Sequence, residues 1–151
     1  NFLHVTIEFA AMGWAIGASV GMALAQKPNT VICITGDGSC LMNGQEITVA
    51  QEYGLPVVFI ILNDGNLGMV KHGQHLAKAE SIGTRLPAVN FARLAEAMGV
   101  EGHTIRCPED WYSLNLKATW KRTAPIVLNV LVDPDEVPPI GVRVRALSGE
   151  G

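Results

Sequence analysis

Two short segments combine an acidic side chain with glycine, and their residue types suit metal and phosphate chemistry. The first is Gly36-Asp37-Gly38-Ser39 and the second is Asn63-Asp64-Gly65. Mg²⁺ prefers oxygen ligands and usually takes one or two carboxylates together with phosphate oxygens and water. The glycines allow backbone groups to approach a ligand closely. We therefore predict a site for a metal-bound diphosphate, with Asp37 and Asp64 as metal ligands.

The anion has a second expected partner in the backbone after the first acid. The N–H groups of Gly38 and Ser39 lie near the start of an expected helix, where the positive end of the helix dipole attracts anions. Two carboxylates without a counterion would repel phosphate groups. A bound metal ion removes that conflict.

The flanking residues predict how the two acids come together. Residues 31–35 and 57–62 are apolar runs, typical of strands that are buried on both faces of a parallel sheet. We expect a helix over residues 42–53 between them. Strand–helix–strand crossovers are almost always right-handed and return the second strand parallel to the first. Both acids then emerge at the carboxyl edge of the sheet, about 5 Å apart if the strands are neighbours, and open α/β sheets bind ligands at this edge.

This arrangement resembles the thiamine diphosphate motif, which opens with Gly-Asp-Gly and closes with a pair of Asn-type residues. Residues 10–18, Ala-Ala-Met-Gly-Trp-Ala-Ile-Gly-Ala, resemble the Met-Gly helix start of the acetolactate synthase group. Leu67-Gly68-Met69-Val70 resembles the Gly-Met-Val segment of that group, and residues 89–99 resemble its next helix. The similarity covers nearly the whole chain. It implies that residues 1–151 form the C-terminal diphosphate-binding domain of such an enzyme, a three-layer α/β/α sandwich with a mostly parallel, doubly wound sheet.

The resemblance also implies roles for individual positions. The Mg²⁺ ligands are the side chains of Asp37 and Asp64 and the backbone carbonyl of Asn66. Met12 supports the bent shape of thiamine diphosphate, and the carbonyl of Ala10 accepts a hydrogen bond from its 4′-amino group. Asp64 stands where many relatives have Asn, which adds a negative charge beside the metal. The residues expected to contact the cofactor are Ala10, Met12, Gly36, Asp37, Gly38, Ser39, Asp64, Asn66, Gly68 and Met69, and those expected to face the substrate are Met69 and Val70.

The family places one catalytic group in a different domain. A Glu of a pyrimidine-binding domain protonates the aminopyrimidine ring, which then deprotonates C2 of the thiazolium. Glu46 and Glu52 follow the diphosphate loop, and nothing places either residue against that ring. Because the chain starts at Asn1 without an initiator Met, we expect an excised or truncated domain, or a natural small subunit, that is inactive alone. The resemblance implies a pyrimidine-binding domain of the same or another subunit as partner, and a homodimer or homotetramer for the full-length enzyme.

Three functions remain open at this stage. The first is a thiamine-dependent carboligase or 2-oxo acid decarboxylase of the acetolactate synthase type. The second keeps the cofactor but changes the reaction, as in glyoxylate carboligase, oxalyl-CoA decarboxylase or an aldehyde lyase; both act on a small 2-oxo acid or aldehyde. The third is a noncatalytic Rossmann-like nucleotide-binding module. That fold is expected to carry Gly-x-Gly-x-x-Gly after its first strand, whereas here the turn contains an acid that would repel a pyrophosphate without metal.

Length and composition agree with one domain. Of 151 residues, 48% are apolar and the net charge is −3, which does not favour nucleic-acid binding. Cys33, Cys40 and Cys107 lack metal-site spacing, and we interpret them as reduced thiols in the cytoplasm. Residues 9–25 carry no charge, but they are rich in Ala and Gly and are short for a membrane span, so we expect a buried core helix.

The remaining predictions concern scaffold. We expect His72 and His75 to face solvent on a short helix over residues 67–79. Asn90 is expected to cap a helix that ends at Gly99. Further strands are predicted over residues 103–107 and 125–132, with Trp111 and Trp120 directed to the core by the helix between them. Residues 133–151 are expected to form an extended tail.

Overall fold

The computed structural model describes residues 3–5, 10–115 and 122–137. The expectation for Trp120 and most of the expected tail lie outside these residues. The strands are β1 (Val31–Gly36), β2 (Val57–Asn63), β3 (Glu101–Ile105) and β4 (Ile126–Leu131), and the helical elements are α1 (Trp14–Ala25), α2 (Asp37–Asn43), η1 (Gly44–Glu46), α3 (Ile47–Glu52), α4 (Gly68–Leu76), α5 (Phe91–Ala97) and α6 (Pro108–Ser113).

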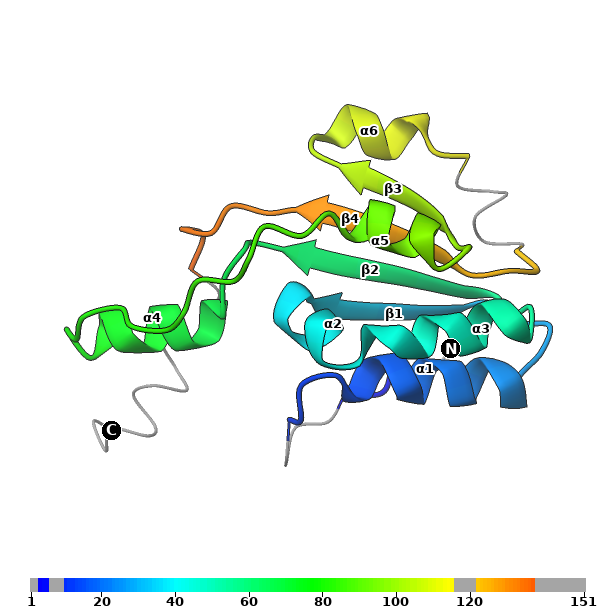
Figure 1. Ribbon diagram of the computed structural model, residues 1–151, viewed down its shortest axis with the longest axis horizontal. Coiled ribbons are helices and arrows are strands. Elements are labelled where there is room, and N and C mark those ends of the chain that lie inside the picture. The colour runs from blue at the N-terminus through cyan, green and yellow to red at the C-terminus, as the bar shows by residue number, and fades with distance from the viewer. Residues whose placement is uncertain (1–2, 6–9, 116–121, 138–151) are drawn as a thin grey trace.

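The four strands form one parallel sheet in the order β1-β2-β4-β3 (Figure 1). The register pairs Val31 with Val57 and Gly36 with Leu62, so β1 and β2 end side by side. Asp37 directly follows β1, and Asp64 directly follows β2. The two acids therefore lie at the same carboxyl edge, as the crossover rule predicts.

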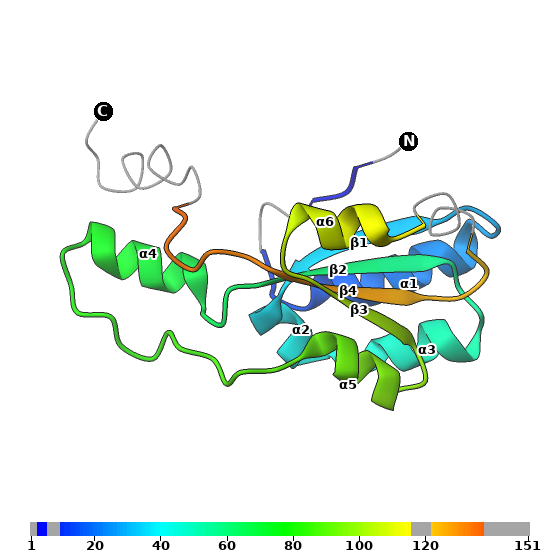
Figure 2. The same cartoon turned by 90° about the horizontal axis from the view of Figure 1, so that it is seen from above.

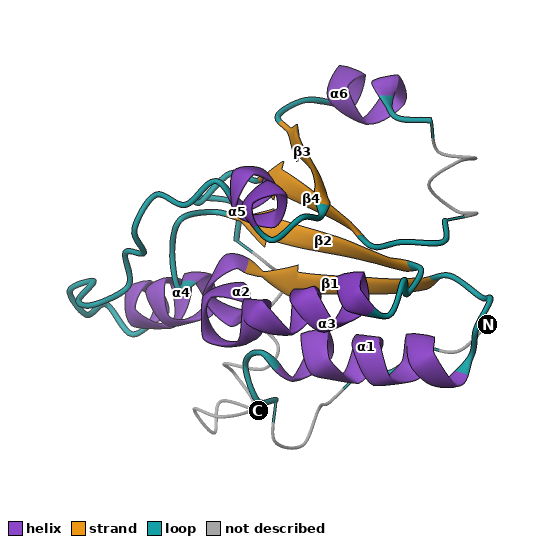
Figure 3. Ribbon diagram, turned by 45° about the vertical axis from the view of Figure 1, so that its right-hand side comes forward, coloured by secondary structure: helices purple, strands orange, loops and turns teal. Residues whose placement is uncertain are grey.

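Helices cover both faces of the sheet, and the predicted three-layer α/β/α fold is confirmed. Helices α1, α2, α3 and α5 pack on one face, and α6 lies over the opposite face (Figures 2 and 3). The larger core contains Ile16, Phe59 and Phe91, all at most 2% exposed. A smaller cluster of Val58, Ile126 and Leu128 packs beneath Trp111 of α6. This places Trp111 against the core, as predicted.

Strand β1 departs from the expectation of burial on both faces. Ile32 and Ile34 are 51% and 62% exposed, whereas Val31, Cys33 and Thr35 are buried. β1 is one of the two edge strands of the sheet, and α6, which covers this face, packs over β3 and β4 near the opposite edge. No described element covers this face of β1, so its apolar run is half exposed in this chain.

The predicted helix over residues 42–53 is wrong in its bounds. The helical segment starts at Asp37, directly after β1, and is broken at Asn43, whose φ of −143° is not helical. The break coincides with tight packing on α1, because the Asn43 side chain donates to the Gly13 carbonyl at 3.4 Å and a Cβ at Gly13 would lie 2.9 Å from Asn43 Cβ. Tertiary contact thus overrides a continuous helical pattern.

Other boundaries follow local rules. The Asn90 side chain accepts from the N–H of Arg93 at 3.0 Å, and Gly99 adopts a φ of +76°, so the predicted cap and terminator of α5 are confirmed. β3 begins at Glu101, two residues before the predicted start at residue 103.

We predict that Gly102→Ala destabilises the fold. A Cβ at Gly102 would lie 2.8 Å from Ala92 Cα, which belongs to the backbone of α5 and cannot turn aside as the end of a flexible side chain could. The expected loss is about 1–3 kcal/mol of unfolding free energy, measured by chemical denaturation. Gly21→Ala in α1, where a Cβ would meet nothing within 4 Å, is the matched control and should raise stability by about 0.5–1 kcal/mol. Equal stability of Gly102→Ala and the parent would contradict this packing.

Candidate metal and diphosphate site

The carboxylate of Asp37 joins the ends of β1 and β2. Its Oδ1 accepts from the N–H of Gly38 at 2.7 Å, and its Oδ2 accepts from the N–H of Gly65 at 2.8 Å. Asp37 is only 5% exposed. Because Gly65 belongs to the turn after β2, one side chain fixes the relative position of the two sequence segments.

This environment disfavours the charged form of Asp37. Burial is the largest effect and raises the pKa of the Asp37 carboxyl above its ordinary value. The N–H groups of Gly38 and Gly65 lower the pKa, and the negative charge of Asp64 raises it. Among the described residues the ion pairs lie elsewhere, at Lys71–Asp135, His103–Glu101 and Arg122–Glu101. The site thus has negative charge that an added cation would stabilise.

Asp64 sits in a closed turn beside Asp37. Its Oδ1 accepts from the backbone N–H of Asn66 at 2.8 Å, and the Asn66 amide donates to the Asp64 carbonyl at 2.8 Å. A Cβ at Gly68 would lie 2.6 Å from Asp64 Oδ2. Gly68 therefore leaves the space in which the second carboxylate lies.

The structure brings Met12 to the same place. A Cβ at Gly38 would lie 3.0 Å from Met12 Cε and 2.9 Å from Leu67 Cδ2. Both side chains therefore lie close over the Gly38 backbone, although Met12 remains 44% exposed. A larger residue at position 38 would push the ends of both side chains aside.

The other predicted site residues surround this centre less closely. Ala10 is exposed and has a φ of +46°, an uncommon backbone conformation for a residue with a Cβ. Gly36 ends β1, and Ser39 lies half-buried in α2. Met69 and Val70 lie in the first turn of α4 and are 54% and 47% exposed. No described contact joins these two side chains to the acids.

The expectation that His72 faces solvent is wrong, since it is only 5% exposed, whereas His75 is exposed as expected. Lys71 anchors α4 to the segment after β4 by donating to the Pro134 carbonyl at 3.0 Å and to Asp135 at 2.8 Å. Hydrogen bonding and charge from Lys71 lower the pKa of Asp135, with smaller contributions from His72 and His75. The helix predicted over residues 67–79 is therefore α4, docked on a segment distant in sequence.

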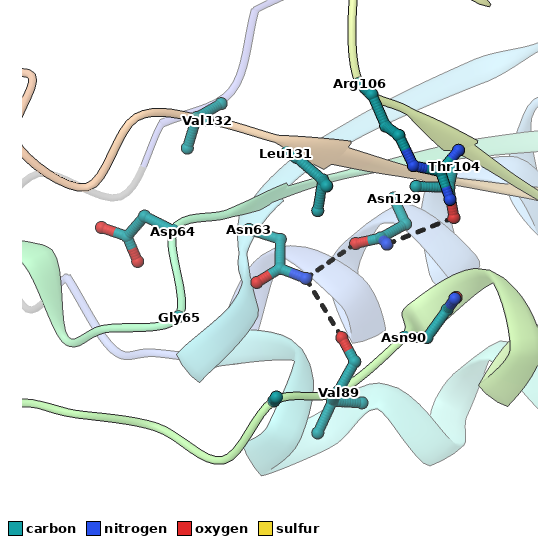
Figure 4. Close-up of a pocket in the computed structure, with 11 residues that line it drawn as sticks. Asn63, Asp64, Gly65, Val89, Asn90, Thr104, Arg106, Asn129, Leu131 and Val132 are labelled. Carbon is teal, nitrogen blue, oxygen red and sulfur yellow. Dashed lines mark hydrogen bonds between the residues drawn. The ribbon is translucent and has the colours of Figure 1, made fainter.

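A pocket of about 450 Å³ opens beside Asp64, and sequence reasoning missed its polar wall (Figure 4). Asn63, Asn129 and Thr104, from three adjacent strands, carry a chain of hydrogen bonds along this wall. The available signal was Asn129, a single polar residue inside the apolar run of β4. The lining residues are Asn63, Asp64, Gly65, Ala88, Val89, Asn90, Thr104, Arg106, Asn129, Leu131 and Val132.

The cysteines are free thiols, as expected. Cys33 and Cys40 are buried, and Cys107 is exposed. Burial raises the pKa of Cys40 to about 12, so this thiol, three residues after Asp37 in α2, stays protonated. Within the described part of the chain, no three His, Cys, Asp or Glu residues gather into a metal site. A metal at Asp37 and Asp64 would thus need further ligands from its anion and water.

No helix in the described ranges combines the length and apolar character needed to cross a membrane. Helix α1 buries only one side, including Ile16, Ser19 and Val20, and exposes Leu24 to 56%. Its Gly13 and Gly17 face Asn43, which is close packing on a neighbouring helix. The core-helix interpretation of this uncharged segment agrees with these contacts.

Comparison with known proteins adds an independent finding. Residues 2–130 match the family model described as "Thiamine pyrophosphate enzyme, C-terminal TPP binding domain". The acetolactate synthase large subunit of Haemophilus influenzae is 38% identical over 142 residues, which cover 91% of this chain and 24% of that protein. Acetolactate synthase isozyme 3 large subunit of Escherichia coli is 37% identical over 139 residues, covering 87% and 24%. This chain thus spans about a quarter of the length of these curated relatives.

Two solved structures resemble this chain over similar fractions of its length. A thiamine diphosphate-dependent 4-hydroxybenzoylformate decarboxylase of Rhodococcus jostii RHA1 has a TM-score of 0.75 and 33% identity, covering 83% of this chain and 24% of that one. Benzoylformate decarboxylase of Polynucleobacter necessarius has a TM-score of 0.78 at 20% identity, covering 86% and 25%. The second likeness supports the fold alone.

We predict that NMR titration of the metal-free protein gives Asp37 a pKa above its ordinary value near 3.8. Asp64→Asn should lower that pKa, because a like charge is removed, but burial should keep it raised. Because the pKa of Asp37 is higher in the folded than in the unfolded state, protonation of Asp37 stabilises the fold, and this stabilisation is complete at pH values below the unfolded pKa. This contribution is lost as pH rises through the folded value, so stability should fall over that window. An Asp37 pKa at or below the ordinary value would contradict the electrostatics described above.

Proposed function

This chain belongs to the thiamine pyrophosphate enzyme family as a C-terminal TPP-binding domain, and we propose that Asp37 and Asp64 hold Mg²⁺ against the diphosphate of thiamine diphosphate. The observation that carries this proposal is the hydrogen bond from Gly65 to Asp37, which unites the two acidic segments at one sheet edge. Asn66 would add its backbone carbonyl as a third ligand from this chain.

The donor set fits Mg²⁺. Two carboxylates with a backbone carbonyl leave positions for phosphate oxygens and water in an octahedral shell. Asp37 is buried without an ion-pair partner among the described residues, and its raised pKa reports the cost of that charge. A divalent cation would offset this cost and the repulsion between Asp64 and a diphosphate.

The backbone fits a diphosphate beside that metal. At Gly38 and Gly68 a Cβ would meet a site side chain within 3.0 Å, so glycine lets the chain pack closely around the two acids. Gly36, the last residue of β1, and Ser39, in the first turn of α2, flank Asp37 and Gly38. Met12 lies over Gly38 and would support the cofactor, with Ala10 on the segment that precedes it. Met69 and Val70 are exposed at the start of α4 and would face the thiazolium and substrate.

The bound thiazolium supplies an electron sink for breaking or forming a carbon–carbon bond next to a carbonyl. The residues of this chain bind and orient the cofactor, and we assign no catalytic acid or base to them. The Glu that activates the aminopyrimidine would come from a pyrimidine-binding domain of the same or another subunit. Activity of the whole enzyme would accordingly need that partner, in a homodimer or homotetramer.

The reaction proposed first is that of an acetolactate synthase-type carboligase or 2-oxo acid decarboxylase, because the curated relatives at 37–38% identity are acetolactate synthase large subunits. Of these two reactions, simple decarboxylation of a 2-oxo acid is favoured by the 33% identity to a 4-hydroxybenzoylformate decarboxylase. The free thiols support a cytoplasmic location.

We predict that Asp37→Ala abolishes binding of thiamine diphosphate with Mg²⁺ in the complete protein, whereas Asp64→Asn retains it. The first change removes the buried carboxylate that joins both segments; the second keeps an oxygen ligand. Isothermal titration calorimetry, with and without Mg²⁺, checks both variants. Glu80→Ala, which removes an exposed carboxylate outside the site, is the control and should bind normally. Normal binding by Asp37→Ala, or NAD binding independent of metal, would contradict the proposal.

A further inference from the structure

An amide is buried at the centre of the sheet, one strand away from the acids. Asn129 is 2% exposed and stands in β4 between Leu128 and Val130. An amide removed from water without hydrogen-bond partners destabilises a fold by a few kcal/mol, about 1–3 in protein mutational data. An apolar residue would suit this strand better on packing grounds alone. The hydrogen bonds of Asn129 must therefore account for its place.

Those hydrogen bonds link three neighbouring strands, with Thr104 in register with Asn129 and Asn63 two residues further toward the carboxyl edge (Figure 4). Asn129 Oδ1 accepts from Asn63 Nδ2 at 2.9 Å, and Asn129 Nδ2 donates to Thr104 Oγ1 at 3.4 Å. The second proton of Asn63 Nδ2 goes to the carbonyl of Val89 at 3.1 Å. Both partners of Asn63 Nδ2 are oxygen acceptors, so the NH₂ group of the Asn63 amide must face them and not its oxygen. The Asn63 amide therefore has one permitted orientation.

The chain of bonds ends at the proposed metal site. Asn63 is the last residue of β2, and Asp64 follows it directly. On the other side of Asp64, the N–H of Gly65 is held by Asp37. The turn that presents Asp64 is thus fastened at both flanking residues, by an amide on one side and a carboxylate on the other.

We propose that Asn129 is a positioning residue, which acts through Asn63 to hold Asp64 in the geometry that a divalent cation needs. This inference rests on the proposed function of the same site. Hydrogen bonds to metal ligands orient those ligands, and removing such a partner typically weakens metal affinity about 10–100-fold. Asn129 acts one residue further out, through the chain neighbour of Asp64, so we expect a loss at the lower end of this range. Thr104 orients the Asn129 amide, and the Val89 carbonyl binds Asn63 to the segment that precedes α5. We call these four residues, Thr104, Asn129, Asn63 and Val89, the clamp.

The test is Mg²⁺ affinity of the complete protein, measured by calorimetry at saturating thiamine diphosphate. Asn129→Leu keeps the size of the side chain but removes the acceptor for Asn63, and we expect Mg²⁺ to bind about 10-fold more weakly. Asn129→Asp keeps an oxygen that accepts from Asn63, and a buried, protonated acid can still donate to Thr104. This conservative variant should restore most of the affinity.

The control for a merely structural role is Val127→Ala. Val127 lies on the same strand and the same sheet face as Asn129, is 1% exposed, and takes no part in the clamp. Its truncation should lower the melting temperature but leave Mg²⁺ affinity close to that of the parent. If Asn129→Leu lowers affinity no more than Val127→Ala does, the proposal is overturned.

Asn63→Ala tests the same clamp from its other end and serves where Asn129→Leu does not fold. It should weaken Mg²⁺ binding within the same range, and the double variant should be no weaker than the poorer single variant, since residues of one network are not additive. Unchanged affinity in Asn63→Ala, or fully additive losses, would overturn the proposal. Failure of the proposed function is distinguishable, because then Asp37→Ala would also bind Mg²⁺ and cofactor normally.

Discussion

The site depends on one buried carboxylate that accepts two backbone hydrogen bonds. Asp37 binds the N–H of its neighbour Gly38 and the N–H of Gly65 from the next strand. Without this side chain, the loops after β1 and β2 would have no described bond between them at the acids. Burial also raises the Asp37 pKa, so a cation beside this carboxylate would stabilise its charged form.

The rest of the domain serves to bring this carboxylate and Asp64 together. Parallel pairing of β1 with β2 ends both strands at one edge. The crossover through α2 and α3 contributes Ile47 to the larger core, which also contains Phe59 of β2. The three-strand network of Thr104, Asn129 and Asn63 extends this support from the sheet to the turn. Apolar packing positions the backbone, and polar contacts then orient the side chains at its edge.

Much of this framework follows from local sequence rules. Apolar runs that each precede an acidic, glycine-containing segment predicted β1 and β2, and the crossover rule predicted that Asp37 and Asp64 share an edge. Asn90 and Gly99 marked the ends of α5 because their capping chemistry is local. The roles of Met12 and Gly68 came instead from family resemblance. The structure adds the close contacts that Met12 makes over Gly38 and that Asp64 makes at Gly68.

The predictions that were wrong concern features determined by contacts between segments distant in the sequence. The helix break at Asn43 reflects its contact with Gly13, and the burial of His72 accompanies the docking of α4 through Lys71. Ile34 is exposed because β1 is an edge strand, which its own apolar sequence does not reveal. The clamp at Asn129 needed the strand order, since β4 lies between β2 and β3 in space but follows both in the chain.

The most direct measurement is a crystal structure of the complete protein with thiamine diphosphate and Mn²⁺ in place of Mg²⁺, with the ion located by anomalous diffraction. The account predicts one ion that is coordinated by side-chain oxygens of both Asp37 and Asp64 and by diphosphate oxygens, at about 2.0–2.2 Å, close to Mg²⁺ distances. An ion bound to the diphosphate but remote from both carboxylates would contradict it.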